Sequence, residues 1–331
     1  MSNPTICVAG GGSWGTALAH LLAANGHDTC QWLRDDTVAQ AVNAHHENPR
    51  YLPGFALHDS LQATTAPTAL GREVVVLAVP CQQLRGWLTA NSSYFCTNTV
   101  LVNAAKGIET TNLLTCAEIV QQTLAHLQPR YAVLSGPSFA ADVLRGLPTA
   151  VVLASADEAL GHTLRQIFSS ASFRCYSSTD VMGVEMGGAL KNVMAIAAGV
   201  CDGLGLGHNS RAALITRGLA EMSRLGVARG AQPHTFMGLS GLGDLTLTCT
   251  GDLSRNRQVG LRLGRGEKLD QITASLGMVA EGVKTTAAIH DLARQLHVDA
   301  PLTDAVYSIL YGGCDPHEAL HNLMARRLRD E

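Results

Sequence analysis

The apolar stretch Thr5-Ile6-Cys7-Val8-Ala9 runs directly into Gly10-Gly11-Gly12-Ser13-Trp14-Gly15, and an alanine-rich segment follows at residues 16–25. This order predicts a buried strand, a tight turn and a helix. Glycines at 10, 12 and 15 allow the backbone to come close to a ligand, so that the N–H groups at the helix start can face a pyrophosphate. An ordinary strand-to-helix turn has the same spacing, but the flanking strand and helix favour a dinucleotide-binding site.

Beyond this turn, the first half of the chain alternates short β-rich runs with helical patterns, which predicts βαβ units and a parallel sheet. Several runs consist almost entirely of Val, Ile, Leu and Ala, as expected for strands covered on both faces. We expect strands at residues 5–9, 28–33, 74–79, 99–104, 131–135, 149–154 and 173–176. The fold class is therefore α/β, with an N-terminal domain of the Rossmann type.

The pattern changes near residue 180, where strand signals fade and helical periodicity takes over. Helices are expected at residues 181–201, 211–225 and 316–329, with Gly226 as the C-terminal cap of the second. Since 331 residues exceed what one hydrophobic core usually supports, we expect two domains. We expect residues 1–180 to form the dinucleotide-binding domain and residues 181–331 to form an all-helical substrate-binding and catalytic domain.

Composition excludes several classes of protein. The net charge of −3 gives no basic field for nucleic acid or an anionic membrane surface. The nine cysteines form no Cys-x-x-Cys pair, so reduced thiols and a cytoplasmic location fit best. The N-terminus lacks the basic start of a secretory signal. We expect no stable membrane insertion, because the longest apolar run, at 189–201, is interrupted by Lys191 and Asn192.

The end of the second expected strand bears on cofactor choice. An acidic residue there binds the ribose hydroxyls of NAD, whereas an arginine accommodates the 2′-phosphate of NADP. The sequence reads Trp32-Leu33-Arg34-Asp35-Asp36. Arg34 favours NADP, and NAD stays possible if Asp35 or Asp36 is the residue that reaches the ribose.

Two segments follow strands at the edge where ligands bind in open α/β sheets. Lys106 follows one strand, and Gly136-Pro137-Ser138-Phe139-Ala140 follows another. Lys106 could neutralise substrate or pyrophosphate charge, while Gly136 and Ser138 could donate hydrogen bonds. A surface lysine and a Gly-Pro turn are the alternative interpretations of these two segments.

Lys191 is the most chemically suggestive residue of the second half. Its surroundings, Gly187-Gly188-Ala189-Leu190-Lys191-Asn192-Val193-Met194, are so apolar that an unpaired ammonium would be costly and its pKa open to depression. Such a lysine can act as a general acid, or its side chain can reach solvent and carry no role. Further along, Asp244 could orient an ammonium, and Ser254-Arg255-Asn256 offers donors suited to a phosphate monoester.

One motif is set aside. His317-Glu318-Ala319-Leu320-His321 matches the zinc-protease pattern on an expected helix. No further His or Glu follows at a suitable distance other than Glu331, and the segment fits a terminal amphipathic helix. We therefore expect no metal site.

Together these segments resemble the bacterial NAD(P)-dependent glycerol-3-phosphate dehydrogenases. The resemblance spans nearly the whole chain and departs at Gly11, where that family usually has alanine. The matching blocks are Gly12-Ser13-Trp14-Gly15-Thr16-Ala17-Leu18-Ala19, Ala105-Lys106-Gly107-Ile108-Glu109, Ser135-Gly136-Pro137-Ser138-Phe139-Ala140, Ala189-Leu190-Lys191-Asn192-Val193, Leu214-Ile215-Thr216-Arg217-Gly218-Leu219-Ala220-Glu221-Met222, residues 241–250 and Ser254-Arg255-Asn256-Arg257.

The resemblance implies reduction of dihydroxyacetone phosphate to sn-glycerol 3-phosphate for phospholipid synthesis, by a homodimer. It implies that Lys191 donates and accepts the proton, with Lys106 and Asp244 as further catalytic residues. The implied substrate-binding residues are Lys106, Gly136, Ser138, Lys191, Asp244, Ser254, Arg255 and Asn256. The implied cofactor-binding residues are Gly10, Gly12, Ser13, Trp14, Gly15, Arg34, Tyr51, Lys106, Ala140, Arg255, Val279 and Glu281.

Two alternatives remain open from the residues themselves. One is another two-domain NADP-dependent dehydrogenase that acts on a hydroxy acid or a sugar phosphate; the Ser254-Arg255-Asn256 segment argues against uncharged substrates. The other is a dinucleotide-sensing protein without catalysis, which would have no need for Lys106, Lys191 and Asp244 together.

Overall fold

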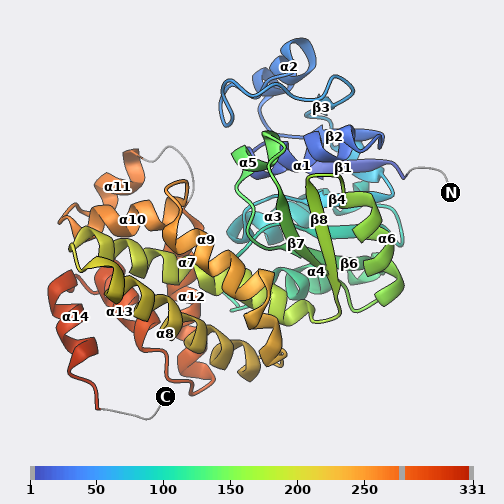
Figure 1. Cartoon of the computed structure of the whole chain (residues 1–331). Helices are drawn as coiled ribbons and strands as arrows, with labels where there is room; N and C mark the ends of the chain where they lie inside the picture. The colour runs from blue at the N-terminus through green and yellow to red at the C-terminus, as the bar shows by residue number, and fades with distance from the viewer. Residues whose placement is uncertain (1–3, 276–279, 328–331) are drawn as a thin grey trace. The chain divides into compact units, whose positions relative to one another are not determined.

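The computed structural model describes residues 4–275 and 280–327. They form two compact units, the first containing the described residues up to Lys106 with Leu114–Val184, and the second containing Gly107–Leu113 with the described residues from Glu185 on. Figure 1 shows the sheet of the first unit, in blue to green, and the helices of the second, in yellow to red. The α/β fold class with a helical second part is confirmed.

The first unit is built on an eight-stranded sheet in the order β3-β2-β1-β4-β5-β6-β7-β8. The strands β1 to β6 lie parallel in the order of the Rossmann fold, and β1 pairs with both β2 and β4. The strands are β1 Ile6–Ala9, β2 Thr29–Trp32, β3 Gln62–Thr64, β4 Val74–Leu77, β5 Val100–Asn103, β6 Arg130–Ser135, β7 Thr149–Ala154 and β8 Phe173–Ser178.

Helices cover both faces of this sheet. Alternate residues of β1 point to opposite faces: Ile6 and Val8 pack in the cluster with α1, while Cys7 and Ala9 pack in the cluster with α3 and α4. All four residues are buried, which explains why the run is continuously apolar. The helices of this unit are α1 Ser13–Ala24, α2 Asp36–His45, α3 Cys81–Asn91, α4 Cys116–Leu124, α5 Ala140–Leu144 and α6 Glu158–Phe168, with short 3₁₀ turns at Pro67–Gly71, Ser92–Tyr94 and Ala125–Leu127.

Each expected strand forms, but the sheet differs from the expectation in two ways. The strand β3 was not predicted, because Gln62-Ala63-Thr64 is short and carries no apolar run. The strand β7 runs antiparallel to β6, and β8 follows the direction of β7, so the sheet is mostly and not wholly parallel. An apolar run predicts burial, but it does not encode the direction in which a strand enters the sheet.

In the second unit, the described residues from Glu185 on contain helices and no strand. The helices are α7 Val181–Gly203, α8 Gly207–Ala228, α9 Asp244–Thr250, α10 Arg255–Gly264, α11 Leu269–Ser275, α12 Glu281–Gln295, α13 Pro301–Tyr311 and α14 Pro316–Met324, with a 3₁₀ turn at Pro233–Met237 and a π-helical turn at Leu239–Gly243. The helix α7 begins at Val181, where the pattern changes in the sequence.

The prediction for Gly226 is wrong. It lies within α8, and an added Cβ would come 2.1 Å from the Phe236 ring, so the glycine provides space for that ring and does not end the helix. The last helix also ends earlier than expected, at Met324.

The expectation about apolar runs needs correction too. Within the described part of the chain, α7 is long and apolar enough to cross a membrane by length and composition, and Lys191 and Asn192 do not interrupt it. The qualifying stretch is wholly buried inside the protein, as in the core helix of a globular unit. Both polar residues are buried with hydrogen-bond partners, which is why the helix tolerates them.

Candidate functional site

The glycine turn lies at the carboxyl end of β1, next to β4, where the chain crosses to the other half of the sheet. Gly10 has φ +143°, and a Cβ there would lie 2.6 Å from the carbonyl oxygen of Ala78. A Cβ at Gly15 would lie 2.3 Å from the Gly10 oxygen, whereas a Cβ at Gly12 would meet nothing within 4 Å. The turn is therefore closely packed on its inner side and open at Gly12.

The opening at Gly12 lies at the start of α1. Gly12 is the N-cap of this helix and makes no side-chain cap hydrogen bond. The first N–H groups of a helix carry a partial positive charge and need acceptors. An open, uncapped helix start behind a glycine turn fits the pyrophosphate of a dinucleotide.

Two buried amides that were not predicted hold this turn from behind. The Gln31 side chain on β2 donates to the Gly10 oxygen, and the Asn48 side chain donates to the Gly11 oxygen, each at 2.9 Å. Both amides also donate to the Thr16 hydroxyl, again at 2.9 Å. A glutamine between Cys30 and Trp32 in an apolar strand was the signal that sequence reasoning overlooked.

The other predicted cofactor residues of the first unit lie around the turn. The Ser13 hydroxyl donates to the Tyr51 carbonyl at 2.9 Å, so these two residues come together. Trp14 and Ala140, at the starts of α1 and α5, pack against the same hydrophobic cluster. The indole N–H of Trp14 is buried without a partner in the described residues.

Arg34 is exposed just beyond the end of β2. The neighbouring Asp35 caps α2: its carboxylate accepts hydrogen bonds from the N–H groups of Thr37 and Val38. It also forms an ion pair with Arg50, at 2.8 Å. The hydrogen bond from Val38, with those from Arg50 and Thr37, lowers the pKa of Asp35. Because both oxygens of Asp35 already have partners, its carboxylate is poorly suited to a ribose.

Lys106, Gly136 and Ser138 come together at the same edge of the sheet. The carbonyl oxygen of Gly136 accepts from the Lys106 ammonium at 3.2 Å and from the Ser138 hydroxyl at 3.0 Å. Gly136 has φ +139°, and a Cβ there would lie 2.9 Å from Cα of Val151. The cluster is thus fixed by backbone packing, and Gly136 acts through its carbonyl as an acceptor of hydrogen bonds.

In the second unit, Lys191 and Asp244 form a buried ion pair. Nζ of Lys191 donates to Oδ1 of Asp244 at 2.5 Å and to the Thr248 hydroxyl at 2.8 Å. The Lys191 side chain is only 9% exposed, so it does not extend to solvent. Thr248 was not predicted; it lies one turn after Asp244 on α9 and donates to its carbonyl oxygen at 2.6 Å.

A glycine explains why these residues meet. Gly187 lies one turn before Lys191 on α7, and a Cβ there would come 2.6 Å from the carbonyl oxygen of Ser240. The π-helical turn Leu239–Gly243 can therefore pack on the backbone of α7, and it leads directly into Asp244. Burial raises the pKa of the neighbouring Cys249 thiol to about 12.

The predicted phosphate-binding residues lie at the start of α10. Ser254 is the N-cap of this helix and accepts from the Arg257 N–H at 3.2 Å, while Arg255 is exposed. Asn256 donates to the Asn192 side chain at 2.9 Å and accepts from the Gly282 N–H at 3.0 Å. Asn256 thus joins α10 to α7 and α12, and we call the residues Ser254, Arg255 and Asn256 the α10 corner.

The remaining predictions concern α12 and the discarded zinc motif. Glu281 is the first residue of α12, and Val279 lies outside the described residues. His317 and His321 lie on α14. Over residues 4–275 and 280–327, no three His, Cys, Asp or Glu side chains are grouped so as to hold a metal ion.

Comparison with known proteins decides the family. Residues 5–161 match the model of the NAD-dependent glycerol-3-phosphate dehydrogenase N-terminus, and residues 180–321 match that of its C-terminus. The chain belongs to the NAD-dependent glycerol-3-phosphate dehydrogenase family. It is accordingly an oxidoreductase.

Individual members of this family extend the match over nearly the whole chain. A glycerol-3-phosphate dehydrogenase [NAD(P)+] from Desulfovibrio desulfuricans is 74% identical over 327 residues, which cover 99% of this chain and 98% of that protein. The crystal structure of the glycerol-3-phosphate dehydrogenase of Coxiella burnetii is 38% identical with a TM-score of 0.93, and the match covers 98% of this chain and 99% of that one. The resemblance inferred from the sequence is confirmed.

A more distant structure shares only the fold. The complex of D-mandelate dehydrogenase with NADH is 14% identical with a TM-score of 0.63, and the match covers 93% of this chain and 98% of that one. The two-domain architecture therefore does not distinguish the glycerol-3-phosphate dehydrogenase family from other dehydrogenases. The residues of the site must do so.

Proposed function

We propose that this chain interconverts dihydroxyacetone phosphate and sn-glycerol 3-phosphate, with Lys191 as proton donor and acceptor. The observation that carries the proposal is the buried Lys191–Asp244–Thr248 cluster. The residue that follows Lys191, Asn192, is bonded to the α10 corner. The helical unit thus offers both a proton donor and donors suited to a phosphate monoester.

The glycine turn is the proposed pyrophosphate site, for which the open space at Gly12 and the uncapped start of α1 are the support. Gly10, Gly15, Ser13 and Trp14 would shape this site. When bound, the reduced nicotinamide supplies a hydride to the ketone carbon. The first unit is proposed as the dinucleotide-binding domain, ending near residue 180, and the second as the substrate-binding domain.

NADP is the proposed cofactor over NAD. Arg34 is exposed beyond β2, and Asp35 already serves as a helix cap and a partner of Arg50. A guanidinium binds a phosphate dianion with parallel N–H donors, whereas an engaged carboxylate has little capacity left for ribose hydroxyls.

Lys191 would act on the oxygen of the ketone. As the carbonyl carbon is reduced, its oxygen becomes an alkoxide that needs a positive charge and a proton. The Lys191 ammonium supplies both, and Asp244 offsets the cost of burying that charge. Asp244 and Thr248 also fix the direction of the ammonium, which keeps the donor aligned with the oxygen.

The α10 corner would bind the substrate phosphate through the Arg255 guanidinium, the Asn256 amide and the Ser254 hydroxyl. Lys106, which shares the Gly136 carbonyl with Ser138, would add positive charge towards the substrate and the cofactor. Arg255 and Glu281 are also proposed to contact the dinucleotide, with Ala140 and Tyr51.

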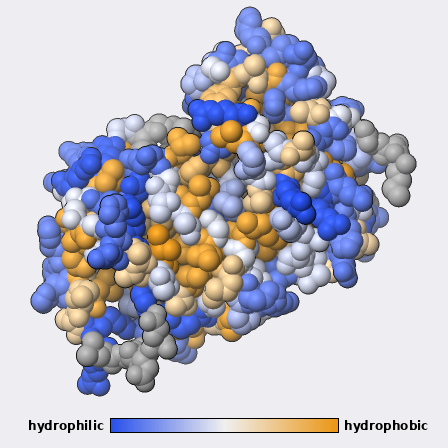
Figure 2. Space-filling view, viewed as in Figure 1, coloured by the Kyte–Doolittle hydropathy of each residue, from blue (hydrophilic) through white to orange (hydrophobic). Residues whose placement is uncertain are grey.

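We further propose a cytoplasmic homodimer that supplies glycerol 3-phosphate for phospholipid synthesis. Support for a second copy comes from large apolar side chains at the surface of the helical unit, and Figure 2 shows hydrophobic residues gathered on its visible face. The large exposed ones of this unit are Val227, Met237, Leu242, Leu253, Tyr311 and Met324. Sedimentation of the purified protein measures the oligomeric state.

One assay tests the activity. Oxidation of NADPH and of NADH is followed by absorbance with dihydroxyacetone phosphate, dihydroxyacetone, a 2-keto acid and a phosphorylated sugar ketone. We expect turnover with dihydroxyacetone phosphate to exceed that with the others by at least about 10²-fold. Faster turnover of the keto acid or the sugar phosphate would instead favour another two-domain dehydrogenase, and binding of NADPH without turnover would favour a sensor.

A further inference from the structure

The helix α10, which carries the α10 corner, crosses α7 with its backbone in direct contact. A Cβ at Gly199 would lie 2.1 Å from the Arg257 carbonyl oxygen, and one at Gly203 would lie 2.4 Å from the Leu261 oxygen. On the facing helix, a Cβ at Gly260 would lie 2.0 Å from the Ile196 oxygen, and one at Gly264 would lie 2.6 Å from the Val200 oxygen. No side chain separates the two helices at this crossing.

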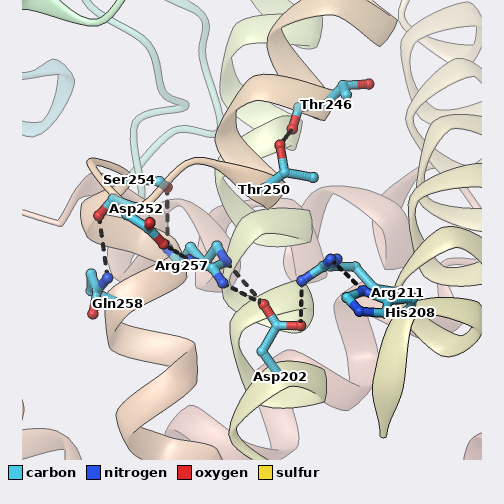
Figure 3. A network of polar contacts seen from close by, with 9 residues as sticks. All are labelled: Asp202, His208, Arg211, Thr246, Thr250, Asp252, Ser254, Arg257 and Gln258. Carbon is cyan, nitrogen blue, oxygen red and sulfur yellow. Dashed lines mark hydrogen bonds and ion pairs between the residues drawn. The ribbon is translucent and has the colours of Figure 1, made fainter. Parts of the chain in front are cut away.

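An ion pair closes the crossing on the side of the α10 corner (Figure 3). The Arg257 guanidinium donates twice to Oδ2 of Asp202, from Nε at 3.0 Å and from Nη2 at 2.7 Å. The other oxygen of Asp202 accepts from Arg211 on α8 at 3.0 Å. The Arg257 and Asp202 side chains are 10% and 12% exposed, so solvent screens this pair little.

Arg257 is also tied to the segment that precedes it. Its backbone N–H donates to the Ser254 hydroxyl at 3.2 Å, and its Nη1 donates to the exposed Asp252 at 2.8 Å. Burial on its own lowers the pKa of the guanidinium, but the hydrogen bonds to Asp202 and Asp252 outweigh burial and raise that pKa. The arginine therefore stays charged, and it links Asp252, which precedes the α10 corner, to Asp202 on α7.

We propose that Asp202 and Arg257 are positioning residues that hold the α10 corner at a fixed distance from the ammonium of Lys191, and so fit the site to the length of a three-carbon phosphorylated ketone. The inference rests on the proposed function, in which the corner binds the phosphate. Neither residue needs to touch the substrate. A displaced α10 corner would bind the phosphate less tightly and so raise KM, while Lys191 stays in place and kcat is kept.

The test is Asp202→Asn, which keeps the shape of the side chain but replaces one acceptor oxygen by a donor. We expect KM for dihydroxyacetone phosphate to rise about 10-fold or more, with kcat changed by less than about twofold. Inorganic phosphate, used as a competitive inhibitor, should lose affinity in parallel. Reduction of dihydroxyacetone, which has no phosphate to bind, should keep its kcat/KM.

The matched control is Glu267→Gln. Glu267 forms an ion pair, at 2.5 Å, with Arg262, which lies near the other end of α10. If the Asp202 ion pair affected KM only by stabilising the helix α10, both variants would change KM by a similar factor. We expect Glu267→Gln to leave KM within about twofold. Arg257→Lys, which keeps the charge but loses the two-pronged contact, should repeat the effect of Asp202→Asn in milder form and serves if Asp202→Asn does not fold.

Two results would overturn the inference: an unchanged KM in both Asp202→Asn and Arg257→Lys, or an equal loss of kcat/KM for dihydroxyacetone and its phosphate. Arg255→Ala separates this failure from that of the proposed function. If Arg255→Ala raises KM and Asp202→Asn does not, only the positioning role is wrong. If neither raises KM, the α10 corner is not the phosphate site, and both proposals fall.

Discussion

Lys191 and Asp244 form an ion pair in the interior of the helical unit, with the side chains 9% and 1% exposed. A buried pair of this kind contributes little net stability, yet removal of one partner leaves the other charge without compensation. The same contact that would direct the proton donor therefore makes simple mutagenesis ambiguous, because loss of the lysine affects both folding and turnover.

Lys191→Ala should lower kcat by about 10² to 10⁴, since a general acid contributes that much. It should also lower the free energy of unfolding by about 3–5 kcal/mol, because Asp244 remains buried and unpaired. Binding of NADPH, measured by nicotinamide fluorescence, should be retained. Near-normal turnover would remove the lysine from the mechanism.

The double variant Lys191→Met/Asp244→Asn separates the two effects. It contains no buried charge at this site, so that a large part of the lost stability should return, as measured by urea unfolding. Turnover should stay as low as in Lys191→Ala. A double variant that regained activity would mean that Lys191 only supports the fold.

Arg255→Ala should raise KM for dihydroxyacetone phosphate by about 10- to 10²-fold. Charge-assisted hydrogen bonds of the kind a guanidinium makes to phosphate are worth about 1.5–3 kcal/mol. Arg265→Ala is the control, since Arg265 is exposed at the other end of α10. An unchanged KM in Arg255→Ala, or an equal rise in Arg265→Ala, would argue against a phosphate contact at Arg255.

Arg34→Ala should lower kcat/KM for NADPH by about 10-fold and leave that for NADH almost unchanged, because only NADPH carries a 2′-phosphate. Steady-state rates with each cofactor give the ratio. Arg130→Ala removes another exposed arginine, which pairs with Asp157, and should leave the ratio unaltered. Equal losses with both cofactors would assign Arg34 to a part of the dinucleotide that NAD shares.

Asn48→Ala should weaken NADPH binding about 10-fold, because the Gly11 carbonyl and the Thr16 hydroxyl lose a buried donor, at a cost of about 1–3 kcal/mol. Fluorescence titration measures the Kd for NADPH. Hydrogen exchange of the backbone amides at residues 10–15 measures how often the glycine turn opens. Asn43→Ala is a matched control: Asn43 also makes two hydrogen bonds to backbone, both to Ala63. A normal Kd in Asn48→Ala would show that the turn holds its shape without the amide.

Glu221 predicts a pH dependence of stability. This buried carboxylate accepts from the N–H and hydroxyl of Thr303 and from the Leu302 N–H, and thereby caps α13 from α8. Burial raises the pKa of Glu221 above its ordinary value of 4.5. The hydrogen bonds act in the opposite direction, but they offset the effect of burial only in part. The native state then binds a proton more tightly than the unfolded chain does, so its contribution to stability is fully present below about pH 4.5 and is lost as the pH rises through the higher native pKa.

The measurement is the free energy of unfolding of the wild type and of Glu221→Gln, at intervals of roughly one pH unit between about pH 4 and 8. Glutamine does not titrate, so the difference, wild type minus variant, should fall as the pH rises above about 4.5. A difference that grew with pH would mean that the carboxylate is favoured over the acid in the native state.

The sequence predicted those parts of the fold that depend on local pattern. The run Ile6-Cys7-Val8-Ala9 reads as a buried strand because both faces of the sheet are covered. The turn that follows needs glycine at Gly10 and Gly15, where a Cβ would lie 2.6 Å and 2.3 Å from carbonyl oxygens. The reversed direction of β7 and the short β3 could not be predicted, since strand pairing depends on distant segments.

The site divides in the same way. Lys191 was predicted from one charge in an apolar helix, but the roles of Thr248 and of the neighbouring Asn192 are recognised only from the residues that they contact. Asn48 lies in a loop, and its importance comes from the backbone of the glycine turn, which is remote in sequence. Gly226 was misread because a glycine that makes room for an aromatic ring resembles one that ends a helix.

The glycine crossing of α7 and α10 has a consequence for redesign. Where two main chains touch, their spacing is set by the radii of backbone atoms and cannot be adjusted by small changes of side-chain size. A mutation at Gly199 or Gly260 would move the helix as a whole or unfold it. A variant that accepts a longer phosphorylated ketone is therefore better sought by insertion at the exposed residue Leu253, which precedes α10 and takes no part in the crossing.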